Sequence, residues 1–357
     1  MKLIHCSDLH LDSALGRNFT AVQAKERNAE LCATFARMVH YALEQQVSAL
    51  LIAGDLFDSA HVSLQTMDYI LRQIRNAPDV TFFLLRGNHD GGQDAFAGQV
   101  LPENLKTFEK EWKSYRLQDV VITAAEPEGD GWHTMYDRLN LNRQDINIVM
   151  LHGQISSRAG EDQIALPLLR GKGIRYLALG HLHTHQSGKL EPDAVYCYSG
   201  CPEGRGFDEC GEKGFVLMET ENGRIHSRFV PFASRTLHDV DVDITDAQTV
   251  TQILERLERA VAGIGSEDMV KFRLCGTYTL GAQKDLTFLH KMLAGSFHCV
   301  KIKDESHLKI DADSFAFDAS LKGELIRLVL ASERSETEKE RIITCGIRAL
   351  CDGEVTL

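Results

Sequence analysis

The chain has 357 residues, of which 43% are hydrophobic and 25% are charged, an ordinary balance for a globular protein. The formal net charge is −12, with 30 acidic and 24 basic side chains in residues 1–235 and 21 and 15 in the remainder. Because DNA attracts clustered Lys and Arg, this charge counts against a free-standing DNA-binding protein. No apolar run approaches the roughly 20 residues of a membrane span. The nine cysteines are scattered without a CxxC pair, so we expect reduced thiols in a cytoplasmic protein.

Short apolar runs alternate with helical stretches through residues 1–235. This alternation predicts an α/β domain built of layers. The later strands follow one another closely, which predicts that part of the sheet is antiparallel or belongs to a second sheet. The predicted strands are 3–6, 49–53, 80–85, 120–123, 146–151, 176–179, 194–198 and 214–219, and the predicted helices are 21–45, 63–76 and 105–117.

The pattern restarts after Pro231. The order strand, helix, strand, helix, strand predicts a small α+β domain at 236–310, in which Asp246 would cap the first helix. The segment 311–357 is predicted to hold two short helices separated by a charged stretch, and these either cover the core or dock a partner. The predicted strands are 237–244, 270–280 and 298–302, and the predicted helices are 246–262 and 285–293.

Residues that can bind metals follow five of the predicted strands, each at the carboxyl end. Ligand sites of open α/β sheets lie at this edge, where loops carry polar groups and the strands fix their positions. We therefore expect the five loops to converge on one site. The candidate ligands, in chain order, are Asp8, His10, Asp55, Asn88, His152, His181 and His183.

The types of these residues favour a pair of divalent cations. Two cations about 4 Å apart need a bridging anion, because their charges repel each other. Asp55 is the natural bridge, since Gly54 allows the chain to turn at the strand end. Mixed His, Asp and Asn ligands favour Mn²⁺, with Fe²⁺ or Zn²⁺ as alternatives, over Mg²⁺ or Ca²⁺. The absence of Cys among the candidates disfavours a structural zinc site.

Five short motifs carry a resemblance to a known family. They are DxH at 8–10, GDxxD at 54–58, GNHD at 87–90, HG at 152–153 and GHxH at 180–183. In this order they resemble the calcineurin-like metallophosphoesterase superfamily over about residues 1–220. The tracts 8–13, 198–205 and 212–215 are similar to DNA repair exonucleases of the SbcD and YhaO type. Two positions depart from that pattern: Asp58 stands where these nucleases often carry His, and Leu9 where SbcD commonly carries Trp.

The resemblance implies a fold and a division of the ligands between two metals. The fold would be a four-layer αββα sandwich followed by a small α+β capping domain. A metal-bound water would attack phosphorus in line. One metal would be held by Asp8, His10, Asp55 and His183, and the other by Asp55, Asn88, His152 and His181.

Three further residues have roles that the resemblance implies. His89, directly after Asn88, would stabilise the transition state or protonate the leaving oxygen. Asp90 would orient His89, as carboxylates behind a site commonly do. Asp58 would brace the site in a similar way, or would instead cap the following helix.

Other polar residues near these motifs have plainer interpretations. His5 lies in the first predicted strand and is interpreted as a core histidine, whereas His185 is interpreted as a solvated surface residue. Arg205 and Arg86 lie near the edge of the inferred site. A role as surface arginines is slightly favoured for both over contacts with phosphate.

Three hypotheses for function remain open. The leading one is a metal-dependent DNA exonuclease or endonuclease that works with a coiled-coil ATPase of the SbcC type, which would supply most of the DNA-binding surface; a homodimer is a further expected assembly. The second is a phosphatase or nucleotide phosphodiesterase acting on a small substrate, which suits the acidic surface better. The third is a non-catalytic scaffold, which the complete ligand set and His89 disfavour.

Overall fold

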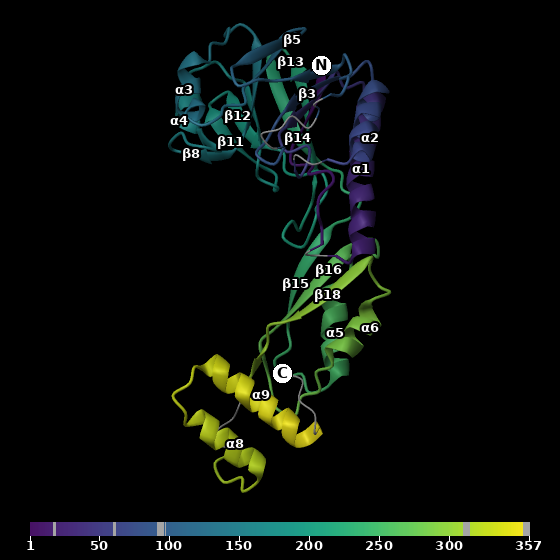
Figure 1. The fold of residues 1–357 in the computed structure, drawn as a ribbon, viewed down its shortest axis with the longest axis vertical. Helices are drawn as coiled ribbons and strands as arrows, with labels where there is room; N and C mark the ends of the chain where they lie inside the picture. Colours follow the sequence, from purple (N-terminus) through teal and green to yellow (C-terminus); the bar gives the residue numbers. More distant parts are fainter. Residues whose placement is uncertain (17–18, 60–61, 91–95, 97, 310–314, 353–357) are drawn as a thin grey trace. The chain divides into compact units, whose positions relative to one another are not determined.

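The computed structural model describes residues 1–16, 19–59, 62–90, 96, 98–309 and 315–352. The chain forms two compact units, Met1–Thr236 and Leu237–Leu357, which are described separately below (Figure 1). The sequence places the first domain boundary after residue 235. The further boundary expected at residue 310 lies within the second unit and stays a prediction.

Two six-stranded sheets form the centre of the first unit. In the first sheet the order is β14 (Arg224–Pro231), β13 (Gly214–Glu221), β1 (Lys2–Cys6), β2 (Ala49–Ala53), β3 (Thr81–Leu85) and β4 (Leu105–Thr107). In the second it is β11 (Gln186–Glu191), β12 (Ala194–Tyr198), β10 (Tyr176–Gly180), β7 (Ile146–His152), β6 (Val120–Ala124) and β5 (Lys113–Leu117). A small parallel pair, β8 (Gln154–Ser156) and β9 (Gln163–Ala165), follows β7.

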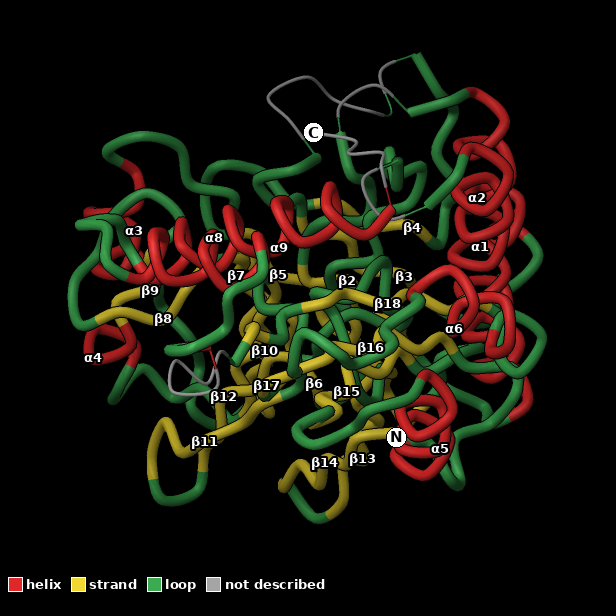
Figure 2. Tube along the Cα trace, turned by 90° about the horizontal axis from the view of Figure 1, so that it is seen from below, coloured by secondary structure: helices red, strands yellow, loops and turns green. Residues whose placement is uncertain are grey.

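Alternation of side chains along the strands builds the layers. On β2, Leu51 faces the second sheet and packs in one core with Met150 and Ala178, while Leu50 packs in a separate core with α1 and α2. The central strands are therefore buried on both faces, which explains their nearly continuous apolar sequences. Helices cover the two outer faces, α1 and α2 on the first sheet and α3 and α4 on the second (Figure 1, Figure 2). The αββα sandwich expected from the resemblance is confirmed. The helices are α1 (Ala21–Glu44), α2 (Leu64–Arg75), α3 (Gly131–Arg138) and α4 (Leu166–Leu169).

The helix predicted at 105–117 is wrong, because this segment contains β4 and β5. The lysines and glutamates of the segment have good helix propensity. On β5, however, Tyr115 packs against the core between the sheets, while Arg116 points to the opposite side and pairs with Asp145. The strand pairs with β6 along its whole length, so tertiary pairing overrides local propensity.

The second unit contains a parallel three-stranded sheet, whose inner face packs against two helices. Thr249 caps the first of these helices, so the prediction of Asp246 as the cap was wrong. The strand predicted at 270–280 is interrupted at Gly276, which has a φ of 83°. The elements are β15 (Leu237–Asp243), α5 (Val250–Ala260), β16 (Met269–Cys275), β17 (Thr277–Tyr278), α6 (Leu286–Leu293), β18 (Cys299–Asp304) and β19 (His307–Leu308).

Two helices follow in the same unit, α8 (Leu321–Leu330) and α9 (Glu336–Asp352). Their contact is apolar and joins Ile326 and Val329 to Ile343. The charged stretch expected to separate the helices lies largely inside α9. Of the predicted segment 311–357, residues 311–314 and 353–357 lie outside the described residues. Within the described part of the chain, none of the helices has the length and apolar character that a membrane span requires.

Candidate metal centre

Five loops meet where the parallel strands β1, β2, β3, β7 and β10 end. Four of the seven candidate ligands in these loops have left-handed backbone conformations, namely Asp8 (φ 54°), His10 (45°), Asp55 (53°) and His181 (105°). Non-glycine residues adopt such conformations at a cost of about 1–3 kcal/mol each, and they concentrate where function requires them. The backbone is thus strained at the carboxyl edge that the sequence predicts for the site.

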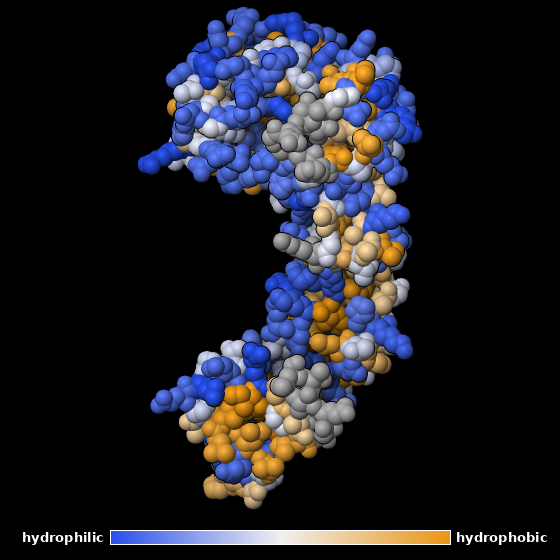
Figure 3. Space-filling view, viewed as in Figure 1, coloured by the Kyte–Doolittle hydropathy of each residue, from blue (hydrophilic) through white to orange (hydrophobic). Residues whose placement is uncertain are grey.

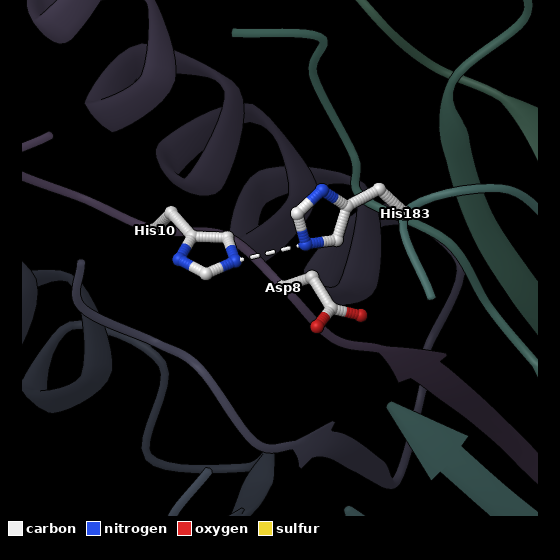
Figure 4. Close-up of side chains that lie close together, drawn as sticks. All are labelled: Asp8, His10 and His183. Atoms are coloured by element: carbon white, nitrogen blue, oxygen red, sulfur yellow. Dashed lines mark hydrogen bonds between the residues drawn. The ribbon is translucent and has the colours of Figure 1, made fainter. Parts of the chain in front are cut away.

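The donor atoms of the first predicted ligand set point at one another. His10 Nε2 lies 3.2 Å from His183 Nε2 and 3.6 Å from Asp55 Oδ2. Asp8 joins the two histidines in one group whose donor atoms lie within 4.8 Å of one another (Figure 4). We call this group, with Asp55, the first site.

The second predicted set meets on the other side of Asp55. Asp55 Oδ2 lies 3.3 Å from His152 Nε2, so one carboxylate oxygen faces both His10 and His152. Asn88 Oδ1 lies 3.0 Å from His152 Nε2 and 3.4 Å from His181 Nδ1. Asp55, Asn88, His152 and His181 are called the second site. The position of Asp55 between the two groups is the one that a bridging ligand requires.

The histidines also fit metal binding by the way in which their other ring nitrogens are held. The Nδ1 atom of His152 lies 2.9 Å from the carbonyl oxygen of Ala53, and that of His183 lies 2.7 Å from Glu209 Oε1. His10 Nδ1 lies 3.1 Å from Asp58 Oδ1. For His152 and His183, a hydrogen-bond acceptor at Nδ1 fixes the ring and leaves the Nε2 lone pair for a cation, an arrangement common behind metal ligands. The contact of His10 with Asp58 has the distance of an ion pair but not the geometry of a hydrogen bond. The residues present therefore fit a pair of divalent cations.

The ligand side chains can converge because the backbone at two glycines lies close to them. A Cβ at Gly54, whose φ is 94°, would lie 2.1 Å from His152 Nδ1. A Cβ at Gly87 would lie 2.2 Å from Asp55 Oδ1. Only glycine leaves room for the ligands at these two positions, which explains the glycines of the GDxxD and GNHD motifs.

The sequence model of the calcineurin-like phosphoesterase family matches residues 1–185, more than half of the chain. The chain belongs to this family. Among its relatives, the metallophosphoesterase YhaO of Bacillus subtilis (strain 168) is 30% identical over 305 residues, which are 78% of this chain and 72% of YhaO. The DNA double-strand break repair protein Mre11 of Sulfolobus acidocaldarius is 24% identical over 281 residues, 73% of this chain and 72% of Mre11. The SbcD subunit of the nuclease SbcCD of Escherichia coli (strain K12) is 26% identical over 277 residues, 64% of this chain and 67% of SbcD.

These relatives confirm the resemblance to the SbcD and YhaO type. As a calcineurin-like phosphoesterase of this type, the chain is a metal-dependent phosphoester hydrolase. The family uses a dinuclear metal centre, and the groups around Asp55 are its candidate in this chain. The assignment of individual ligands stays a prediction.

His89 and Asp90 occupy different positions around the centre of this phosphoesterase. The His89 side chain is 45% exposed, and its backbone N–H donates to Asp55 Oδ1 over 2.9 Å. Asp90 is buried and accepts hydrogen bonds from the N–H groups of Phe57 and Gly87. Burial raises the pKa of Asp90 to about 6, although these two hydrogen bonds lower it. Asp90 thus ties the loop of His89 to the loop after β2, whereas His89 Nδ1 lies 3.3 Å from the carbonyl oxygen of Asp58.

The site contains two residues whose roles the sequence did not identify. Arg205 was interpreted as a surface arginine, but its side chain is only 16% exposed and pairs with Asp58 and Glu209. Glu209 was missed altogether, although it lies between the tracts 198–205 and 212–215, which resemble the SbcD type. Asp58 does not cap α2, because Ser63 does. Glu209 is one of several acidic residues in a glycine-rich loop, and local pattern alone does not distinguish it from its neighbours.

Two histidines outside the ligand sets are structural. His5 is fully buried, and its Nδ1 lies 3.0 Å from the hydroxyl of Tyr176, as expected for a core histidine. His185 is not the solvated residue that we expected. Its ring stacks on Phe229 with centroids 4.6 Å apart, and its Nδ1 lies 3.0 Å from the carbonyl oxygen of Tyr198.

A cavity of about 300 Å³ opens beside the second site. Leu85 and Trp132 supply apolar surface, and Asn88 and His152 border the cavity on the side of the ligands. The charged residues of the lining are mainly acidic. They are Arg86, Glu126, Glu128, Glu161 and Asp162, of which Arg86 and Glu126 form an ion pair.

Metal binding is expected to release protons and to strengthen as the pH rises. Burial alone would lower the pKa of His152, but the hydrogen bond and charge of Asp55 outweigh it and raise the pKa to about 9. In the metal-free protein the contact between protonated His152 and Asp55 stabilises the fold. This stabilisation is fully present below pH 6.5 and is lost as the pH rises through 9. A cation needs the neutral ring, so each pH unit below 9 weakens binding by up to about tenfold.

Isothermal titration calorimetry with Mn²⁺ at about pH 7.5 measures this release. Two buffers with different enthalpies of protonation would give different apparent binding enthalpies if protons are released. Equal enthalpies in both buffers would contradict the prediction. The exposed His40 serves as a control, since His40→Gln should leave the proton release unchanged.

Proposed function

We propose that this phosphoesterase is a DNA nuclease of repair type, which hydrolyses phosphodiester bonds with two divalent cations, most favourably Mn²⁺. The observation that carries the proposal is the complete double ligand set around Asp55, with His89 beside it, in a chain related to Mre11 and to SbcD. A scaffold would have no need of this set. The ligand assignment is part of the proposal, with Asp8, His10, Asp55 and His183 at the first site and Asp55, Asn88, His152 and His181 at the second.

The residues of the chain have distinct roles in this reaction. When bound, the two cations supply a nucleophilic hydroxide near neutral pH and neutralise charge on the phosphate. Asp55 keeps the negative charge that a bridging ligand needs. Burial alone would raise its pKa, but His152 and His10 outweigh burial and lower it to about 2. His89 presents its exposed ring to the substrate, where it stabilises the transition state or protonates the leaving oxygen. Asp90 holds the loop of His89 in place.

The cavity beside the second site suits the nucleoside next to the scissile phosphate. Its volume is at the lower end of the range for small-molecule pockets, of the order of 300–1,000 Å³. Leu85 and Trp132 offer apolar surface for a base, while the carboxylates of Glu161 and Asp162 can accept hydrogen bonds from amino or hydroxyl groups. An acidic lining would not attract a second phosphate.

A partner is proposed to bind the second unit. Figure 3 shows apolar side chains gathered over α8 and α9. Leu321 and Leu328 of α8, and Phe317 shortly before it, are large apolar residues that are exposed. We infer that a coiled-coil ATPase of the SbcC type docks on this surface, as the resemblance implies, and supplies basic surface for DNA. That supply would compensate for the net charge of −12.

The second candidate function is hydrolysis of a small nucleotide phosphodiester or phosphomonoester. The acidic net charge and the acidic cavity favour this function. An acidic chain repels a long polyanion such as DNA more strongly than a small substrate. Both candidates use the same metal chemistry. They differ in whether a long DNA strand can reach the cations.

A comparison of substrates separates the two functions. Purified protein with Mn²⁺ would be given linear duplex DNA, single-stranded DNA and bis(p-nitrophenyl) phosphate, with and without the ATPase partner. The nuclease proposal expects DNA cleavage that the partner stimulates, together with slower turnover of the small ester. Turnover of the small ester without DNA cleavage, even with the partner present, would overturn the proposal in favour of the small-substrate enzyme.

A further inference from the structure

Arg205 connects two carboxylates that each hold a histidine of the first site. Its Nη1 lies 2.8 Å from Asp58 Oδ1, and its Nε and Nη2 lie 3.0 and 2.7 Å from Glu209 Oε1. The same oxygen of Asp58 is 3.1 Å from His10 Nδ1, and the same oxygen of Glu209 is 2.7 Å from His183 Nδ1. The contacts form a continuous arch, His10–Asp58–Arg205–Glu209–His183, which we call the arginine arch.

The arch joins loops that are distant in the sequence. Asp58 follows β2, whereas Arg205 and Glu209 belong to the loop between β12 and β13. Ser13 donates to the second oxygen of Asp58 over 2.8 Å, and the backbone N–H of Arg205 donates to the second oxygen of Glu209 over 2.7 Å. Each carboxylate is therefore held on both oxygens. The planar guanidinium fork can serve two carboxylates at fixed angles, which a Lys ammonium cannot.

These contacts occupy three of the five N–H donors of Arg205. Nε, Nη1 and Nη2 each already contact a carboxylate oxygen. The Glu209 side chain is 4% exposed, so the pair is poorly screened by solvent. Arg205 supplies the positive charge that the neighbouring carboxylates of Asp58 and Glu209 need.

We propose that Arg205 is a positioning residue that orients two histidine ligands of the first site together and thereby sets the affinity for one of the two cations. Without the guanidinium, Asp58 and Glu209 would lose the positive charge that lies between them, and each would keep only the hydrogen bond to its other oxygen. Each carboxylate would then hold its histidine less firmly. The second site does not depend on the arch, since the carbonyl oxygen of Ala53 holds His152 Nδ1. The inference rests on the ligand assignment proposed above.

Calorimetric titration of the full chain with Mn²⁺ tests this role. The wild type should bind two ions. Arg205→Gln should keep one site at wild-type affinity and weaken the other about 10–100-fold, the usual effect of removing a residue behind a metal ligand. Asp58→Asn breaks the arch at another point and should weaken the same site. Because the two residues act through one contact, the double variant should lose less affinity than the sum of the single losses.

Arg116→Gln is the matched control, because Arg116 makes a similar two-pronged contact with Asp145 on an exposed edge strand. It should bind both ions normally. Two intact sites in Arg205→Gln, or equal weakening of both sites in a variant that melts at the wild-type temperature, would overturn the role of Arg205. If Arg205→Gln does not fold, two intact sites in Asp58→Asn would overturn it. A wild type that binds no Mn²⁺ would instead overturn the ligand assignment.

Discussion

Asp55→Asn is expected to abolish the dinuclear centre and to have the largest effect on activity of any single change. One oxygen of Asp55 faces both His10 and His152, so its negative charge serves both sites. An amide has no charge to screen the repulsion between two cations. We expect at most one Mn²⁺ to remain bound. Turnover should fall by more than about 100-fold, since losing even a residue behind a ligand costs about 10–100-fold.

The measurement combines metal analysis after gel filtration with turnover of bis(p-nitrophenyl) phosphate. Asp68→Asn serves as the control, because Asp68 forms an exposed ion pair with Arg72 on α2. Two ions bound at wild-type affinity in Asp55→Asn would show that Asp55 is not the bridge.

His89→Ala is expected to retain both ions and to lose turnover. The His89 side chain is 45% exposed, and its backbone N–H donates to Asp55, a bond that alanine preserves. Its ring packs edge-on against His10, with ring centroids 4.7 Å apart, but it is not one of the assigned ligands. The loss should be about 10²–10⁴-fold if the ring acts as a general acid. Turnover of DNA should then fall more than turnover of bis(p-nitrophenyl) phosphate, because p-nitrophenolate leaves without needing a proton.

Kinetics on both substrates, together with calorimetric titration of Mn²⁺, measure this effect. Equal losses on the two substrates would favour stabilisation of the transition state by the ring over proton donation. Unchanged turnover with two ions bound would remove His89 from the mechanism. His40→Ala, on an exposed face of α1, is the control for loss of a surface histidine.

The sandwich was predictable because its central strands are short apolar runs buried on both faces. β2 and β10 are buried at every position, and such short apolar runs are typical of strands covered on both faces. The edge strand β5 was not predictable, because only Tyr115 and Leu117 of its five residues face the core. Its other side chains are polar, and only pairing with β6 makes the segment a strand.

The candidate ligands were predictable for a related reason. Each follows a strong strand, and parallel strands carry their carboxyl ends to one edge of the sheet. Arg205 and Glu209 could not be found in this way, since they belong to a long loop between β12 and β13 whose path depends on tertiary contacts. The stacking of His185 on Phe229 likewise joins two segments that are separated in the sequence.

A crystal structure of the protein soaked with Mn²⁺, with anomalous difference maps, tests the metal centre most directly. Two peaks should lie about 3.5–4 Å apart, with the Asp55 carboxylate between them. One peak should lie against His10 and His183, and the other against Asn88, His152 and His181. A single peak, or peaks bound away from Asp55, would contradict the proposed dinuclear centre.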